Sequence, residues 1–207
     1  QALGDGVARD ETGRNHHAVG SGALTDFPMG APGYSGMIPP SAATIASVLR
    51  GGGYSTAFFG KHHNVPKGPF QSSGPFDYLP NRLGFDYFFG FIGSDTDQWR
   101  PTLYRNESRL VDEEPHPILD QRLADAAIHW VHQQKGGNPQ RPFFVYFAPG
   151  SAHTPHQAPA DWIARFKGRF DEGWNVARDQ TLARQKQLGL VPRNARLPVW
   201  PADVPAW

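Results

Sequence analysis

One order of elements occurs twice in this sequence and constrains its fold more than any other feature: helix, glycine turn, apolar strand, histidine-bearing loop. The first copy has a helix ending at Arg50, a turn at Gly51–Gly53 and an apolar strand at residues 54–59. The second has a helix at residues 119–134, a Gly/Pro break and a continuous apolar run at residues 142–147. Apolar strands that alternate with helices predict a mostly parallel sheet, buried between helices. We therefore expect an α/β fold.

The remaining sequence divides around these two copies. Residues 1–40 form a loop-rich lead-in, and residues 41–160 hold the helix–strand core, with Ser41 as the expected N-cap of the first helix. Within the core, residues 64–118 are a long excursion rich in aromatic residues, Gly and Pro, which indicates packed loops and short strands around a pocket rim. Residues 161–207 form a helical, Pro-rich tail.

Charge and composition exclude several classes of partner. The formal net charge is +1, and no basic patch is interleaved with aromatic residues, so nucleic acid is not an expected partner. The sequence has no long apolar segment, and a net charge of +1 gives little attraction to an anionic membrane surface, so membrane binding is not expected. The sequence has no cysteine, which excludes disulfides and thiolate zinc sites.

Basic side chains follow both predicted strands. On an extended backbone Lys61 and His63 project to one side and His62 to the other, while His153 lies in the second loop. The carboxyl ends of parallel strands meet at one edge of a sheet, where ligands of such sheets bind. A fixed ammonium beside an imidazole suits a small oxyanion, with proton transfer alongside. The alternative is that these are ordinary loop residues.

Other histidine and glycine patterns are weaker. His153 and His156 have the i, i+3 spacing of a zinc-binding helix, but Pro155 between them excludes a regular helix, so one is expected in the anion pocket and the other to cap or pack. Gly60–Lys61 fails as a phosphate-binding P-loop, because a histidine stands where Ser or Thr is required. Asn15–His16–His17 is interpreted as a loop whose imidazoles bind backbone carbonyls.

Eight segments occur in an order that is typical of one family: Thr12–His17, Ala43–Tyr54, Phe59–Asn64, Gly74–Asp77, Gly84–Phe91, Arg141–Phe144, Ala152–Pro159 and Gly168–Trp174. Together they resemble the sulfatase family, specifically the bacterial arylsulfatase branch of the alkaline-phosphatase-like superfamily. The resemblance implies a partial sulfatase catalytic domain over residues 1–207, a central fragment or a diverged copy.

The resemblance also implies a chemistry, the hydrolysis of a sulfate monoester by a formylglycine nucleophile beside a divalent cation, usually calcium. Lys61 resembles the family's sulfate-binding lysine, and His63 the histidine that contacts the formylglycine hydroxyl and helps to expel sulfate. His153 resembles the histidine near the bridging oxygen, where it binds substrate and assists the leaving group. His62 stands where the family usually has Trp or Asn, and is expected in the wall of the substrate pocket.

The sequence departs from the family at the nucleophile. The family's Cys/Ser-x-Pro-x-Arg cassette precedes the Gly-Arg-Asn-His-His segment, but Leu3, Asp5 and Val7 stand at its Cys/Ser, Pro and Arg positions. The metal-binding Asp pair belongs upstream of residue 1, and the Asp-Asn pair and second sulfate lysine beyond Trp207. We therefore expect half of a sulfate pocket, no residues for calcium or formylglycine, and a chain that is inactive or nearly so alone.

Two other functions stay open. The first is a non-catalytic anion-binding or scaffold protein derived from a sulfatase, and the second is a phosphodiesterase or phosphonate hydrolase of the same superfamily. The expected ligand in each case is a sulfate ester or another small oxyanion. Because a central piece of this fold would expose sheet edges and apolar faces, a homo-oligomer or a complementing chain is a possible partner.

Overall fold

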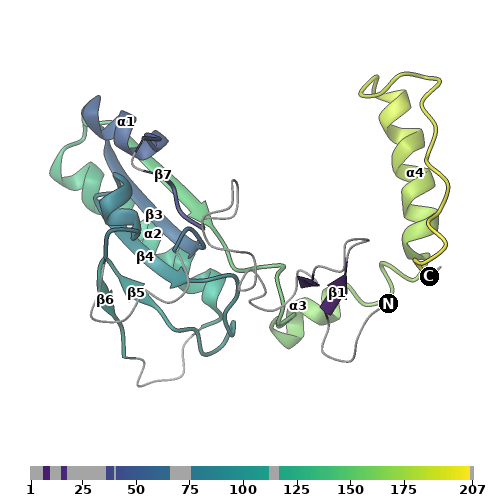
Figure 1. The fold of residues 1–207 in the computed structure, drawn as a ribbon, viewed down its shortest axis with the longest axis horizontal. Helices are drawn as coiled ribbons and strands as arrows, with labels where there is room; N and C mark the ends of the chain where they lie inside the picture. The colour runs from purple at the N-terminus through teal and green to yellow at the C-terminus, as the bar shows by residue number, and fades with distance from the viewer. Residues whose placement is uncertain are drawn as a thin grey trace. The chain divides into compact units, whose positions relative to one another are not determined.

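The computed structural model describes residues 7–9, 15–17, 36–39, 41–65, 76–111 and 117–205. The chain forms two compact units, residues 1–157 and residues 158–207. The first unit holds a five-stranded sheet with the order β6-β5-β4-β3-β7, drawn in Figure 1. It also holds a short antiparallel pair of β1 (Val7–Arg9) and β2 (Asn15–His17), so Asn15–His17 is a strand where a loop was predicted.

The sheet is built around β3 (Ser55–His62), which runs parallel to both of its neighbours. These are β4 (Tyr87–Ile92) and β7 (Phe143–Ala148). Beyond β4, a hairpin of β5 (Tyr104–Arg105) and β6 (Ser108–Arg109) completes the sheet in antiparallel fashion. The predicted α/β class and the parallel pairing of the two apolar strands are thus confirmed.

Side chains alternate along β3 and divide the core between the two faces of the sheet. On one face Phe59 packs with the long helix α2 (Leu119–Gly137), which contributes Leu119, Leu123 and Trp130. On the other face Phe58 packs in a cluster with Ala46 of α1 (Ile45–Gly51). Each fully buried large side chain stabilises the fold by roughly 1.5–3 kcal/mol. These contacts hold β3 in the middle of the first unit.

Two predicted boundaries shift. The N-cap of α1 is Thr44, not Ser41: its Oγ1 accepts the amide of Ser47 at 3.0 Å, as capping requires, whereas Ser41 lies in the preceding turn. Strand β3 continues past Phe59 to His62, because β4 pairs with it residue by residue up to that point. Lys61 and His62 therefore belong to the strand and not to the loop after it.

Strand β7 differs more from its prediction, because an uninterrupted apolar run predicts burial on both faces. Tyr146 is 48% exposed and Phe147 is 42% exposed. Among the strands that the structure describes, β7 pairs only with β3 and so forms an edge. Its side chains therefore lack the neighbouring strand that would cover them.

The second unit is mainly helical. It contains α3 (Ala160–Arg165) and α4 (Gly173–Gln187), followed by an extended segment. This segment returns along α4, where the guanidinium of Arg178 lies 5.2 Å from the ring centroid of Trp200 and donates to the carbonyl of Pro198 at 2.7 Å. Over the described residues, no helix in either unit combines the length and apolar character needed to cross a membrane.

Glycines let the three parallel strands approach closely near their carboxyl ends. Gly60 has a φ of +111°, which side-chain-bearing residues rarely adopt, and a Cβ there would overlap the carbonyl oxygen of Ala148 in β7. A Cβ at Gly90 in β4 would overlap the carbonyl oxygen of Gly60 in turn. A side chain at either position would force the strands apart at this end of the sheet.

We predict that Gly60→Ala destabilises the first unit by about 3 kcal/mol or more, since backbone strain and steric overlap add. Gly53→Ala is the matched control: it has a φ of +88°, but a Cβ there meets nothing within 4 Å. Its cost is expected to be backbone strain alone, about 1 kcal/mol. Urea denaturation followed by hydrogen exchange of the β3 amides measures both, and equal costs would contradict the steric account.

Candidate functional site

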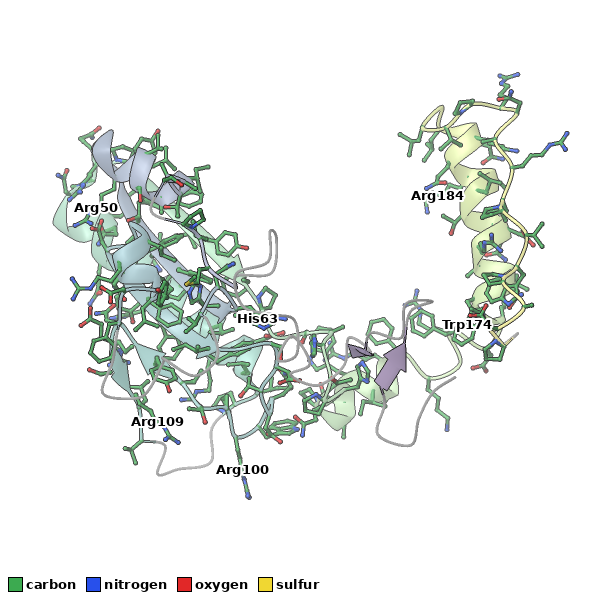
Figure 2. The ribbon with its side chains drawn as sticks, viewed as in Figure 1. Arg50, His63, Arg100, Arg109, Trp174 and Arg184 are labelled. Atoms are coloured by element: carbon green, nitrogen blue, oxygen red, sulfur yellow. The ribbon has the colours of Figure 1, made fainter. Side chains whose placement is uncertain are left out.

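The site lies at the edge of the sheet where the three parallel strands end. Gly60 of β3 is level with Gly90 of β4 and Ala148 of β7, so the loops that follow all three strands start from the same edge. One loop begins at His63, which Figure 2 marks at this end of the sheet. The edge therefore brings together segments that are up to 90 residues apart in the sequence, as the parallel topology predicts.

His62 points away from this edge and into the core. Its ring lies 5.6 Å from the ring of Phe58 and 6.3 Å from that of Phe88, measured between centroids. The side chain is 3% exposed, and its Nε2 lies 2.7 Å from the carbonyl oxygen of Tyr78, to which it donates. These contacts give His62 a packing role in the core, and its expected place in the wall of the substrate pocket stays a prediction.

Burial also fixes the charge of His62. Desolvation lowers its pKa from the ordinary value of 6.5 to about 4, the hydrogen bond to Tyr78 opposes this change, and the nearby His63 adds to it. At neutral pH the imidazole is therefore uncharged. Lys61 and His63 are then separated in sequence by a neutral residue.

Lys61 and His63 are both half-buried. Lys61 is level with Phe91 of β4, and strand alternation directs its side chain to the opposite side from His62. His63 is the first residue after the strand. An ammonium and an imidazole at the end of the central strand can attract an anion and move a proton to or from it.

His153 lies in the loop that follows β7, and its Nδ1 is 2.9 Å from the carbonyl oxygen of Thr154, to which it donates. The same nitrogen is 4.0 Å from the carboxylate of Asp95, in the loop after β4, so the two form an ion pair when the imidazole is protonated. With Nδ1 engaged, Nε2 is the nitrogen left to face a ligand. His156, three residues on, is exposed, so it is not packed in the core, which was one of the two roles expected for it.

Sequence reasoning missed the loop after β4. Asp95, Asp97 and Gln98 follow this strand directly, and Gln98 is buried, with 2% exposure. The signal was present, because an apolar run at residues 87–92 precedes them just as apolar runs precede the two histidine loops. This region was interpreted as packed loops and short strands around a pocket rim, so the run was not identified as a third parallel strand.

The described residues do not fit a calcium ion. Within these ranges no three His, Cys, Asp or Glu side chains gather closely enough to hold a metal. One candidate oxygen of Asp97 accepts the amides of Trp99 and Arg100, and the other accepts from Gln157. This carboxylate is thus already engaged within the protein.

We predict that stability falls as His62 becomes protonated. Because its pKa is lower in the folded chain than the ordinary 6.5, the unfolded chain binds this proton more tightly. The contribution of neutral His62 to the free energy of unfolding is complete above pH 6.5 and is lost as the pH falls toward 4. The free energy of unfolding should fall by about 2 kcal/mol between pH 7 and pH 5. Urea denaturation at several pH values measures it. His62→Gln, whose side-chain N–H can still donate to the carbonyl of Tyr78 but does not titrate, should show a weaker pH dependence over this interval. Parallel curves would contradict the assignment.

Comparison with known proteins finds sulfatases. The sulfatase family model matches residues 7–195. The arylsulfatase of Klebsiella aerogenes is 27% identical over 202 residues, which cover 90% of this chain and 41% of that protein. The uncharacterized sulfatase PB10D8.02c of Schizosaccharomyces pombe is 30% identical over 206 residues, covering 88% of this chain and 35% of that protein.

The fold has solved counterparts. The crystal structure of Ps i-CgsB in complex with k-i-k-neocarrahexaose has a TM-score of 0.51 and 24% sequence identity, covering 63% of this chain and 31% of that one. The chain thus spans less than half the length of each of these proteins. The parallel sheet with basic residues at its carboxyl edge and the match over residues 7–195 agree: this chain belongs to the sulfatase family and has part of its alkaline-phosphatase-like α/β fold.

Proposed function

We propose that this chain supplies the sulfate-binding edge of a sulfuric ester hydrolase that acts on aryl sulfates. The observation that carries the proposal is the shared edge of β3, β4 and β7, from which Lys61, His63 and the His153 loop all emerge. The family membership and the arylsulfatase relative support the choice of sulfate over other anions.

Each basic residue has a role in this proposal. The ammonium of Lys61 attracts the sulfate oxygens as a point charge. When His153 is protonated it pairs with Asp95, and its Nε2 donates to the oxygen that bridges sulfur and the aryl group, which assists the departure of that oxygen. His63, the first residue after the central strand, moves a proton to or from the bound group.

Hydrolysis needs groups beyond these three. In the family, formylglycine supplies the nucleophilic hydroxyl and calcium supplies positive charge, and both carry much of the transition-state stabilisation. The 207 residues contain no Cys/Ser-x-Pro-x-Arg motif, and the described side chains do not fit a metal. We therefore propose that this polypeptide alone binds sulfate esters but turns them over very slowly or not at all.

Anion binding is the first test. We expect Lys61→Ala and His153→Ala each to weaken binding of an aryl sulfate at pH 6 by about tenfold, the effect of losing one charge-assisted hydrogen bond. Lys167→Ala removes the same charge from an exposed position in the second unit and should leave affinity unchanged. Titration calorimetry measures the three variants, and equal affinities throughout would refute the site.

The same titrations, made with phenyl phosphate as well as phenyl sulfate, distinguish a phosphate ester ligand from a sulfate ester ligand. Tighter binding of phenyl phosphate than of phenyl sulfate would favour a phosphohydrolase of the same superfamily over a sulfatase. A sulfate preference that disappears in Lys61→Ala would favour the proposal.

Turnover is the second test. We expect the purified chain with calcium to release the aryl alcohol from an aryl sulfate at the rate of the uncatalysed reaction, because no positioned nucleophile acts with the basic residues. A colorimetric assay of the released phenol measures this rate, with heat-denatured chain as the blank. Rates in the ordinary enzymatic range, roughly 1 per second or faster, would contradict the prediction of inactivity.

A further inference from the structure

Two loops meet across the end of the central strand. The loop at residues 93–99 follows β4 and the loop at residues 149–157 follows β7, and these strands lie on opposite sides of β3. The backbone amide of Gln98 donates to Oε1 of Gln157 at 2.7 Å, and Nε2 of Gln157 donates to the carboxylate of Asp97 at 3.0 Å. One glutamine side chain therefore joins two segments that are about 60 residues apart in the sequence.

The partners of Gln157 are themselves fixed. Oδ1 of Asp97 accepts the amides of Trp99 and Arg100 at 2.8 and 2.7 Å, which sets the orientation of its carboxylate. The carbonyl of Gln98 accepts the first amide of α2, from Leu119, at 2.8 Å. Gln157 is thus bonded to Asp97 and Gln98, and Gln98 is bonded in turn to the start of α2, which covers one face of the sheet.

The hydrogen bond from Gln157 also favours the charged form of Asp97. Together with the amides of Arg100 and Trp99, this bond holds the pKa of the Asp97 carboxyl below its usual value, and the small loss of hydration opposes it only in part. A carboxylate accepts stronger hydrogen bonds than a carboxylic acid does. The contact with Gln157 is therefore strongest when Asp97 is charged.

The loop that bears His153 is held at both of its ends. At its start, the amide of Gly150 donates to Oδ1 of Asp120 in the first turn of α2 at 3.0 Å. At its end, Gln157 is hydrogen-bonded to the amide of Gln98 and to the carboxylate of Asp97. His153 lies midway, and within the loop its amide donates to the carbonyl of Gly150 at 3.2 Å. Fixing both ends limits where the imidazole can reach.

We propose that the pair Asp97 and Gln157 is a positioning clamp, which holds the His153 loop over the end of β3 so that the imidazole can reach an anion bound there. This inference rests on the proposed function of His153. The clamp acts through His153 alone, and neither of its members touches the anion. The cost of losing it is entropic, because a freed loop must be ordered again when the anion binds.

A double-mutant cycle tests this route of action. Gln157→Ala is expected to weaken binding of phenyl sulfate about fivefold, and His153→Ala about tenfold. The double variant should bind no more weakly than His153→Ala, because without the imidazole its placement no longer matters. Multiplied effects in the double variant, about fiftyfold, would overturn the inference.

A matched control and a conservative variant separate positioning from general stability. Gln180→Ala removes a similar amide–carboxylate bond, 3.0 Å long, to Glu172 in the second unit, and should leave phenyl sulfate binding unchanged. Gln157→Glu keeps the length of the side chain but places a second carboxylate against Asp97, and should weaken binding at least as much as Gln157→Ala. Restored affinity in Gln157→Glu would overturn the clamp.

A second readout does not depend on the anion. Nitrogen NMR of the His153 imidazole and hydrogen exchange of its amide report the state of the loop in the free protein. Gln157→Ala should shift the Nδ1 signal and speed amide exchange, while β3 amides stay protected as evidence of an intact fold. Unchanged signals would overturn the clamp. If instead His153→Ala and Lys61→Ala both leave sulfate binding intact, the proposed function fails, and these NMR signals still decide on the clamp.

Discussion

Close backbone contact among three parallel strands underlies the rest of this structure. Gly60, in the central strand, has β7 on one side and Gly90 of β4 on the other, and neither contact leaves room for a side chain. Because the strands stay level up to this point, their loops start from one edge. Without that contact, Lys61 and the His153 loop would not start from the same edge of the sheet.

The central strand then determines how charge is distributed at the edge. Lys61 lies on one side of β3, and His62 on the other is buried among aromatic rings and bonded to Tyr78. The strand thus turns one basic residue inward as a neutral group and keeps its neighbours near solvent. Alternation along a strand, which any extended chain has, is sufficient to place the two basic side chains of Lys61 and His62 on opposite sides, one half-buried and one buried.

Much of this arrangement follows from the sequence alone, and the failures have physical causes. Helix–strand alternation is a strong pattern, so the parallel pairing of β3 and β7 and the shared edge of Lys61 and His153 could be predicted. Strand β4 was not identified as a parallel strand, because its aromatic residues and glycines suit a packed loop or a short strand at a pocket rim equally well. Burial of β7 on both faces was wrong, since apolar composition reports what a strand prefers and not which neighbours it has. Hydrogen bonds such as that of Gln157 to Asp97 join distant segments, and no local pattern encodes them.

The uncovered side of β7 has a consequence for handling the protein. Phe143–Ala148 is an uncharged six-residue stretch of high β-propensity that forms one edge of the described sheet. Its Tyr146 and Phe147 side chains are nearly half exposed to solvent. Segments of this kind, when no further strand lies against them, are where identical molecules stack into fibrils or precipitate. A chain of this composition is therefore best kept dilute, or expressed together with a polypeptide that can add the next strand.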